Sequence, residues 1–385
     1  MAAPSRTRIL IVDDSAVIRS LLRSVLSAHG SFEVAGTAAD GASALQILET
    51  LRPDLVLLDV EMPVLDGLVT LRQLRARGHK MPVIMCSSLT QRGARVTLEA
   101  LAGGASDYVG KPTGQATREA AMRALSAELI PKIQALTGQQ VPPPPAAGPV
   151  RMPLPALLQP QAPAFQPQPP AFKPQPLFGV PVALVIGVST GGPAALEVLL
   201  PALPANFPLP VMIVQHMPEL FTSLFAERLN GRCRLPVREA AEGESVRPGS
   251  IYIARGNWHL EVLASPRGAS HNSLHLTQGP LENHCRPAVD VLFRSAAAVY
   301  GSGVLAVVLT GMGSDGMNGC RFIRAQGGSV LAQDQPTSAV WGMPGAVVQA
   351  GLAHKVLPLN AIASEILRLV GRTHAEAREL REPAV

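Results

Sequence analysis

Three polar residues between positions 189 and 315 of this 385-residue chain are of the types that together support nucleophilic catalysis. Ser189 lies in G-V-S-T-G-G, between an apolar run and a segment opened by Pro193. A G-x-S-x-G turn at such a place lifts a serine hydroxyl clear of a sheet. Because serine is a weak nucleophile, it needs a general base and a carboxylate that orients the base. His216, in V-Q-H-M-P, and Asp315, in T-G-M-G-S-D-G, are the candidates for these roles.

The same glycine-rich turn has two other interpretations, a dinucleotide site and a simple helix cap. A dinucleotide site needs a carboxylate about 20 residues further on, at the end of the second strand. The chain has Gln215 and His216 there. A serine that only caps its helix leaves both proposed partners unexplained. Asp290 and other histidines, such as His259, compete for the partner roles, but Asp290 is expected inside a helix, so the nucleophile interpretation is favoured.

Small residues beside these groups could stabilise a developing negative charge. Backbone N–H groups approach an oxyanion closely where side chains are small, and losing one such donor costs roughly 10²–10³ in rate. Thr190 and Gly191 follow the serine, and Met312 and Gly313 precede the aspartate. These four are candidate oxyanion or substrate contacts, although Met312 is equally consistent with core packing.

A second reactive set, near the N-terminus, consists of carboxylates and one lysine. Asp13 and Asp14 follow the apolar run R-I-L-I-V, Asp59 ends D-L-V-L-L-D, and Lys111 follows D-Y-V-G. Neighbouring carboxylates repel one another unless a hard divalent cation such as Mg²⁺ shares them. A carboxylate beside Mg²⁺ and a lysine is a suitable phosphoryl acceptor. Solvated caps at strand ends are the alternative interpretation.

Strands that alternate with helical segments must bring each set together. Residues 1 to about 130 show this alternation, which predicts a parallel sheet with helices on both faces. Such sheets bind ligands at the carboxyl ends of their strands. The same alternation of strands and helices is predicted over residues 180–370, with apolar strands at Ala183–Val188, Val211–Gln215 and Val304–Thr310. Between Val237 and Gln278 the helical period disappears, which predicts an inserted β-hairpin region.

Composition separates two folded units and excludes some partners. Between Val141 and Gly179 the chain is rich in proline, as expected of an extended tether. Basic residues are dispersed and aromatic residues make up only 4%, which argues against nucleic acid. No charge-free run of about 18 apolar residues suits a membrane span, and no signal peptide is apparent. A cytoplasmic protein without membrane insertion is expected, and the four scattered cysteines suggest no metal site.

The N-terminal motifs resemble those of response-regulator receiver domains. They are I-V-D-D-S, L-L-D-V-E-M-P-V-L-D-G, C-S-S and Y-V-G-K-P. The resemblance implies Asp59 as the phospho-acceptor and a chemotaxis-type histidine kinase as the phosphodonor. It implies an Mg²⁺ site made by Asp13, Asp14, Asp59 and the main-chain carbonyl of Glu61. It also implies that the residues responding to phosphorylation are Ser87, Tyr108 and Lys111.

The C-terminal motifs resemble the catalytic domain of the chemotaxis protein-glutamate methylesterases, the CheB family. They are I-G-V-S-T-G-G-P, V-Q-H-M-P, H-C-R-P-A-V-D-V-L-F-R-S-A-A, L-T-G-M-G-S-D-G and W-G-M-P-G-A. The resemblance implies a triad of Ser189, His216 and Asp315. It implies hydrolysis of γ-glutamyl methyl esters on chemoreceptors with release of methanol, without a cofactor for that step, and in some members deamidation of receptor glutamines. A receiver-controlled hydrolase for another ester and a non-catalytic receiver-linked binding protein are the alternatives.

The expected fold class is α/β, with an N-terminal flavodoxin-like receiver domain and a C-terminal doubly wound methylesterase domain that carries the inserted hairpin region. The predicted boundaries are 1–130 for the receiver, 131–180 for the linker, 181–371 for the catalytic domain and 372–385 for a tail. The resemblance further implies that the unphosphorylated receiver covers the esterase crevice and that phosphorylation changes the docking face. The sequence 254–256, A-R-G, departs from the proline-containing loop expected there, and the linker is longer than the family usually shows.

Overall fold

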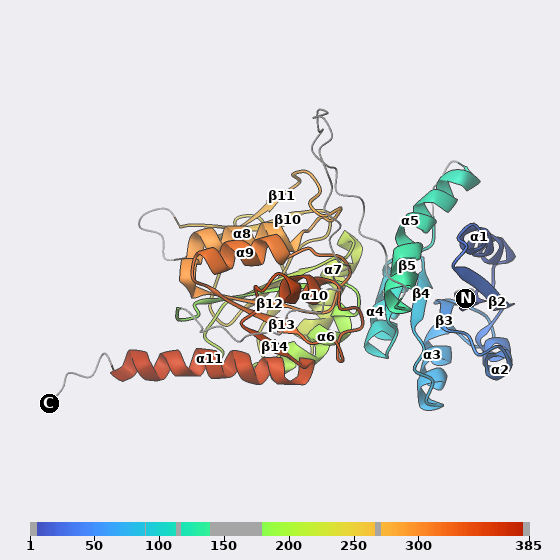
Figure 1. Cartoon of the computed structure of the whole chain (residues 1–385), viewed down its shortest axis with the longest axis horizontal. Coiled ribbons are helices and arrows are strands. Elements are labelled where there is room, and N and C mark those ends of the chain that lie inside the picture. Colours follow the sequence, from blue (N-terminus) through green and yellow to red (C-terminus); the bar gives the residue numbers. More distant parts are fainter. Residues whose placement is uncertain (1–5, 89, 113–116, 139–178, 266–270, 380–385) are drawn as a thin grey trace, which may run out of the picture.

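A computed structural model describes residues 6–88, 90–112, 117–138, 179–265 and 271–379. These residues form two α/β units, joined along the chain by a segment that lies mostly outside the described residues (Figure 1). Helix α5 (Arg118–Leu136) crosses the predicted receiver boundary at 130, and helix α11 (Leu359–Glu379) crosses the predicted start of the tail at 372. The domain boundaries themselves stay a prediction.

The N-terminal unit is a parallel sheet of five strands in the order β2-β1-β3-β4-β5. This is the flavodoxin-like order, and it confirms the predicted fold class. Helices α1 and α5 pack together on one face, and α2, α3 and α4 lie on the other. The elements before α5 are β1 (Thr7–Val12), α1 (Ala16–Ser27), β2 (Phe32–Ala38), α2 (Gly41–Leu51), β3 (Leu55–Asp59), α3 (Gly67–Ala76), β4 (Val83–Ser87), α4 (Gln91–Ala102) and β5 (Asp107–Gly110).

Side-chain caps begin all five helices of this unit. In each case the capping oxygen accepts a hydrogen bond from the backbone N–H three residues further on, which satisfies a donor that the helix itself leaves unpaired. The caps are Ser15, Asp40, Asp66, Thr90 and Thr117. Because the cap of α1 directly follows Asp13 and Asp14, it helps to fix the acidic pair at the end of β1.

The C-terminal unit is built on a parallel sheet of seven strands in the order β14-β13-β12-β6-β7-β9-β8. The chain starts in the middle at β6, builds outward through β7, and then crosses back to β12. Ligand sites of such sheets lie at the carboxyl ends of the strands where this reversal occurs. The main elements are β6 (Ala183–Val188), α6 (Gly192–Leu199), β7 (Val211–Gln215), α7 (Glu219–Asn230), β8 (Val237–Glu239), β9 (Ile251–Ile253), α8 (Val289–Tyr300), β12 (Val304–Val308), α9 (Met317–Ala325), β13 (Ser329–Gln333), α10 (Met343–Gln349) and β14 (Lys355–Leu357), with short 3₁₀ turns η1 (Leu200–Ala202) and η2 (Gly301–Gly303).

The segment between 237 and 278 differs in part from the prediction. Strand β9, in S-I-Y-I-A, was expected in a hairpin but pairs in parallel with β7 inside the main sheet. Its three residues are fully buried, so its sequence is that of a covered central strand rather than of a half-exposed hairpin. Strands β10 (His259–Leu263) and β11 (Ser273–Thr277) form a separate antiparallel pair, which packs on α8 through β10 (Figure 1).

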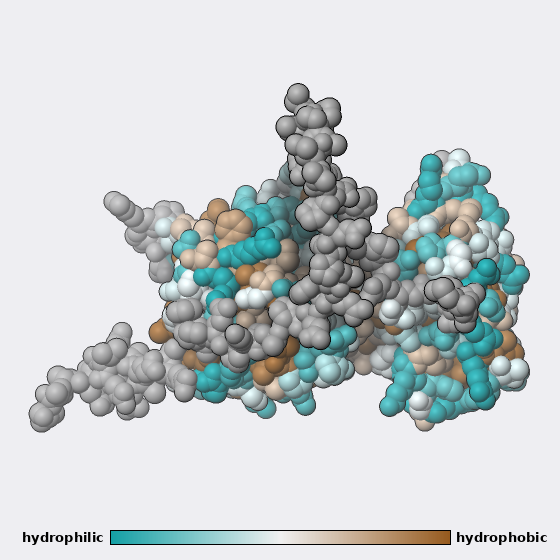
Figure 2. Space-filling model, in the orientation of Figure 1, coloured by the Kyte–Doolittle hydropathy of each residue, from teal (hydrophilic) through white to brown (hydrophobic). Residues whose placement is uncertain are grey.

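The two units contact each other directly. Helix α4 of the receiver packs against α6 and α7 of the catalytic unit, and one apolar cluster contains buried residues of both. Hydrophilic residues are spread over the outer surface of the receiver lobe in Figure 2. Among the described residues, no helix combines the length and the apolar character that crossing a membrane requires.

Candidate active site and phosphorylation site

His216 and Asp315 form a hydrogen-bonded pair at the carboxyl ends of β7 and β12. His216 Nε2 lies 2.8 Å from Asp315 Oδ2. Since the carboxylate accepts this bond, Nε2 carries the proton and Nδ1 is the nitrogen left to act as a base. Nδ1 faces the thiol of Cys285, with Sγ at 3.6 Å. The imidazole is thus oriented by Asp315 on one side and by Cys285 on the other.

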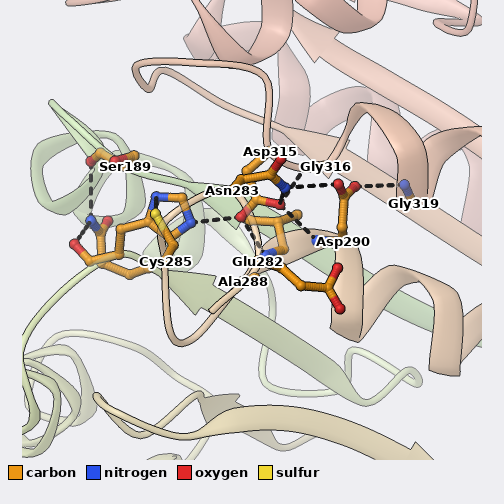
Figure 3. A network of polar contacts seen from close by, with 12 residues as sticks. Ser189, Glu282, Asn283, Cys285, Ala288, Asp290, Asp315, Gly316 and Gly319 are labelled. Carbon is orange, nitrogen blue, oxygen red and sulfur yellow. Dashed lines mark hydrogen bonds and ion pairs between the residues drawn. The ribbon is translucent and has the colours of Figure 1, made fainter. Parts of the chain in front are cut away.

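Asp315 is buried and surrounded by donors. Besides His216, its carboxylate accepts hydrogen bonds from the backbone N–H groups of Val289, Asp290 and Gly316 at 2.6 to 3.0 Å, and from the Asn283 side chain at 2.8 Å. Two of these N–H groups open helix α8, where the helix dipole favours a negative charge. Figure 3 shows this network, with Ser189 at one end and Gly319 at the other. The surroundings therefore hold Asp315 ionised and in one orientation.

These contacts set the protonation of the pair. Burial opposes ionisation of Asp315, but its hydrogen bond and charge interaction with His216 and the N–H donors outweigh burial and lower its pKa. Burial alone would lower the pKa of His216, but its hydrogen bonds to Asp315 and Cys285 outweigh burial and raise this pKa to about 9. At neutral pH the paired state shown here is therefore an ion pair, and catalysis needs the imidazole to lose its proton.

Ser189 follows β6 at a turn that only small residues permit. Its N–H donates to Thr310 O at 3.0 Å, and its carbonyl accepts a hydrogen bond from Gln215 Nε2 at 3.0 Å. Gly191 has a φ of +76°, and a Cβ there would lie 2.6 Å from the Ala339 Cβ. A side chain at this position would meet both backbone strain and a clash. The turn thereby leads from the strand into α6 and leaves Ser189 partly exposed.

Ser189 and His216 line the same pocket, but their side chains are not hydrogen-bonded to each other. Among the hydrogen bonds of the described residues, none connects the Ser189 hydroxyl to the imidazole. The pocket has a volume of about 780 Å³. The four candidate oxyanion or substrate contacts, Thr190, Gly191, Met312 and Gly313, line this pocket too. Contacts between a nucleophile and its base are often loose without substrate, so the roles of these residues stay predictions.

The competing candidates have other partners. Asp290 lies in the first turn of α8, is 1% exposed, and binds Gly319 N–H and Asn283 instead of a histidine. The buried His259 accepts a hydrogen bond from Ala288 N–H and lies 2.9 Å from the carbonyl of Pro280. Neither one pairs with the other, so His216 and Asp315 form the imidazole–carboxylate pair next to Ser189.

The N-terminal carboxylates meet at the edge of the receiver sheet as predicted. Oxygen atoms of Asp13, Asp14 and Asp59 all lie within 4.8 Å of one another. Lys111 Nζ lies 2.8 Å from Asp13 Oδ2 and 2.7 Å from Asp59 Oδ2. Burial raises the pKa of Asp59 to about 6, against the opposing effect of Lys111. The single ammonium thus leaves the cluster with excess negative charge.

This donor set fits a hard divalent cation. The ligands are carboxylate oxygens, which such ions prefer. Among the described residues, the buried Asp13 Oδ2 lacks a well-formed hydrogen bond, although Lys111 pairs with it electrostatically. Glu61 lies two positions after Asp59, and its side chain turns to Arg92 at 3.3 Å. A role for its carbonyl in binding the ion stays a prediction.

Two of the three predicted switch residues, Ser87 and Tyr108, connect this cluster to the catalytic unit. Ser87 is fully buried at the end of β4, and Thr97 Oγ1 of α4 lies 2.7 Å from its hydroxyl. Tyr108 is 7% exposed, and its ring stacks on Phe221 of α7 with the ring centres 4.6 Å apart. Tyr108 therefore contacts the catalytic unit directly, whereas Ser87 is connected to it through α4, which packs on α6 and α7.

A hydrogen bond between the units reaches the residue next to the candidate nucleophile. Thr190 Oγ1 donates to Asp107 Oδ2 at 2.6 Å, and both side chains are buried. Asp107 and Tyr108 of β5, together with Lys132 of α5, line the same pocket as Ser189 and His216. The receiver thus forms one wall of the pocket.

Several of these residues were not found by sequence reasoning. Cys285 lies in the motif H-C-R-P-A-V-D-V-L-F-R-S-A-A, but no role was predicted for it, and Asn283 and Asp107 belong to none of the motifs. Gln215 was noted only for not being a carboxylate. It is nevertheless buried, and its amide holds the carbonyls of both Ser189 and His216.

Comparison with known proteins defines the class. The family model described as response regulator receiver domain matches residues 9–123, and the one described as CheB methylesterase matches residues 184–366. The chain is thus a response regulator with a methylesterase domain.

Relatives match both units at once. A protein-glutamate methylesterase/protein-glutamine glutaminase of Nocardioides sp. is 51% identical over 365 residues, which are 95% of this chain and 96% of the relative. A relative of the same name from Trichodesmium erythraeum is 46% identical over 94% of this chain and 99% of its own length. The chain belongs to the protein-glutamate methylesterase/protein-glutamine glutaminase family. Among solved structures, the Thermotoga maritima CheB methylesterase catalytic domain is 43% identical and covers 50% of this chain and 100% of its own, with a TM-score of 0.48.

Proposed function

We propose that this chain hydrolyses glutamate γ-methyl esters on chemoreceptors, releases methanol, and is regulated by phosphorylation of Asp59 in chemotaxis adaptation. The observation that supports the chemistry most directly is the His216–Asp315 pair, which lies at the topological switch point beside Ser189. The relatives carry the name of this activity. A cytoplasmic location, with a chemotaxis-type histidine kinase as phosphodonor, stays part of the proposal.

The proposed reaction proceeds through an acyl-enzyme. Ser189 Oγ attacks the ester carbonyl while His216 Nδ1 takes its proton, and Asp315 stabilises the imidazolium through Nε2. The tetrahedral intermediate expels methoxide, which takes the proton from His216 and leaves as methanol. Water then attacks the acyl group by the same route and frees the carboxylate and the serine. Backbone N–H groups at Thr190 and Gly191, where α6 begins, and at Met312 and Gly313 are the proposed donors to the oxyanion.

Deamidation of receptor glutamines is a second candidate activity, supported by the names of the relatives. The same attack on a glutamine amide would form the same acyl-enzyme, with ammonia leaving in place of methanol. Both substrates give a glutamate carboxylate as the product.

In the receiver, we propose that Asp13, Asp14, Asp59 and the carbonyl of Glu61 bind Mg²⁺. The ion would neutralise phosphoryl oxygens during transfer. Asp59 is the proposed nucleophile toward the phosphodonor, and Lys111, within 2.7 Å of its carboxylate, supplies a fixed positive charge. Ser87 is placed on the neighbouring strand, where its hydroxyl can turn toward a phosphoryl group on Asp59.

We further propose that phosphorylation relieves an inhibitory contact. In the arrangement described here, Asp107, Tyr108 and Lys132 of the receiver line the pocket of Ser189, and the proposal is that they limit access to the serine. A movement of Ser87 would disturb Thr97 in α4, and a movement of Tyr108 would break its stacking on Phe221. Either change weakens the interface and favours the open arrangement.

The test compares methanol release from methylated chemoreceptor membranes with release from a soluble methyl ester. Ser189→Ala is expected to abolish release from the receptors. Ser223→Ala is the matched control, because the hydroxyl of Ser223 bonds only to Leu220 O within its own helix among the described residues. Full activity of Ser189→Ala would refute the hydrolase mechanism. Activity of the wild type on the soluble ester alone would favour a different ester substrate.

A further inference from the structure

A tight turn carries two side chains to the His216–Asp315 pair. Glu282 and Cys285 exchange backbone hydrogen bonds of 2.8 and 3.2 Å, and the two residues between them, Asn283 and His284, have φ of 50° and 63°. Positive φ at both central positions is the pattern of a type I′ turn, and asparagine tolerates it well. Arg294 of α8 clamps Glu282 with two hydrogen bonds of 2.8 and 2.5 Å. The turn is therefore anchored to the helix whose start binds Asp315.

The amide of Asn283 bridges two buried carboxylates. Its Nδ2 donates to Asp315 Oδ1 at 2.8 Å and to Asp290 Oδ2 at 3.0 Å, which uses both amide protons. The carboxylates are 2% and 1% exposed, whereas Asn283 itself is exposed. Figure 3 shows Asn283 between Asp315 and Asp290, with Gly319 beyond them. The amide thus covers the carboxylate pair on its solvent side.

Asp290 determines which end of the amide faces Asp315. Its other oxygen accepts the Gly319 N–H at 2.6 Å, so the carboxylate is fixed and can only accept from Asn283. An amide turned the other way would place its oxygen against carboxylate oxygens and lose both hydrogen bonds. Asp290 therefore acts on Asp315 through Asn283.

The Asn283 amide affects His216 because it lies between the negative charges of Asp290 and Asp315. Burial raises the pKa of Asp290, and the nearby charge of Asp315 raises it further. Two donated protons between the carboxylates reduce their repulsion. Without them, the negative potential at His216 increases, which stabilises its protonated form, and the Asp315 carboxylate loses one of the bonds that hold Oδ2 toward Nε2.

We propose that Asn283, oriented by Asp290, is a positioning residue of the esterase: it fixes Asp315 so that the carboxylate holds His216 for proton transfer with Ser189. This inference rests on the triad proposed above. It assigns a catalytic consequence to a turn whose residues Asn283, His284 and Cys285 line the pocket of Ser189.

The test is Asn283→Gly in the full chain, because glycine keeps the positive φ and removes the side chain that carries the amide. We expect kcat for methyl ester hydrolysis to fall roughly 10- to 100-fold, as when a supporting residue of a reactive group is lost, with KM within about twofold. The lower limb of the pH–rate profile should move to higher pH. Arg52→Gly is the control, since it also replaces an exposed residue of positive φ by glycine but lies in the receiver and does not line the pocket, and it should leave both quantities within about twofold of wild type.

Each outcome is decisive. An unchanged kcat and pH profile in Asn283→Gly, with Asp315→Asn inactive, would overturn the positioning role and leave the triad standing. A lower kcat with an unshifted pH profile and a lower melting temperature than wild type would mean that the Asn283 bridge only stabilises the fold. That result would also overturn the positioning role. Full activity of Asp315→Asn would instead refute the proposed triad on which the inference rests.

Discussion

The receiver and the catalytic unit each bury a carboxylate beside a cation, but they surround it differently. Asp59 is paired with Lys111 and lies beside two other carboxylates, and burial raises its pKa to about 6. Asp315 is paired with His216 and also accepts hydrogen bonds from Asn283 and three backbone N–H groups, and its pKa is lowered. Both carboxylates are similarly buried, so the opposite pKa shifts are due to the hydrogen-bond donors around each of them.

This contrast matches the work proposed for each site. A carboxylate that must accept a phosphoryl group has to be reachable, and a shortage of donors leaves places for a metal ion. A carboxylate that must hold an imidazole throughout a reaction benefits from a complete set of fixed donors, because it then needs no reorganisation. One site is therefore arranged to change its charge and the other to keep it.

The largest expected effect comes from removing the fixed charge of the esterase. Asp315→Asn should lower kcat roughly 10³- to 10⁴-fold, since an amide cannot hold the same tautomer of His216. Phosphorylation of Asp59 by a small phosphodonor should be unchanged, because the variant lies in the other unit. Methanol release and acyl-phosphate formation measure the two effects. A drop of less than tenfold in methanol release would contradict the comparison.

The pH dependence of the esterase should follow the loss of the proton from His216. Only unprotonated His216 can accept the serine proton, so kcat/KM should increase as pH rises toward the His216 pKa of about 9, by roughly tenfold per pH unit well below it. Cys285→Ala should move the midpoint lower, because the thiol contact contributes to the raised pKa. A rate independent of pH between 7 and 9 would show that His216 is already neutral there.

The receiver carboxylate should affect regulation and not chemistry. Asp59→Ala is expected to retain basal hydrolysis and to lose stimulation by a phosphodonor, and chelating Mg²⁺ should have the same result in the wild type. Initial rates with and without acetyl phosphate measure this. Equal stimulation of wild type and variant would refute the coupling through Asp59.

The smallest effect is expected at the contact between the units. Asp107→Ala removes the acceptor of Thr190 and should raise basal activity by roughly two- to tenfold, the equivalent of one net hydrogen bond. Arg95→Ala is the control: its ion pair with Glu227 at 3.1 Å joins the same two units but is well exposed, so it should change the rate by less than about twofold. A larger increase from Arg95→Ala would place the restraint elsewhere in the interface.

Sequence reasoning was most effective where function depends on strand ends. Ser189, His216 and Lys111 each follow an apolar strand and Asp59 ends one, and the rule for parallel sheets brings such residues together without further information. The fold class, predicted from alternating strands and helices, is confirmed by the sheet order, and the family, predicted from motifs, is confirmed by the comparisons. Asp315 required one more step, because a glycine-rich loop separates it from β12.

The remaining details depend on packing between distant segments. Asn283 and Cys285 lie on a turn reached after the helical period is lost, so no local pattern relates them to His216. The contact of Asp107 with Thr190 depends on how two independently patterned units dock. Strand β9 was misassigned because three residues are too few to distinguish a buried parallel strand from part of a hairpin.

The hydrogen bond from Thr190 to Asp107 has a kinetic consequence. Because Thr190 directly follows the serine and is a proposed oxyanion donor, a receiver that holds its side chain restrains the backbone that the transition state would use. Repression by the docked receiver should then lower the turnover number even at saturating receptor, whereas a mere obstruction of the entrance would be overcome by more substrate.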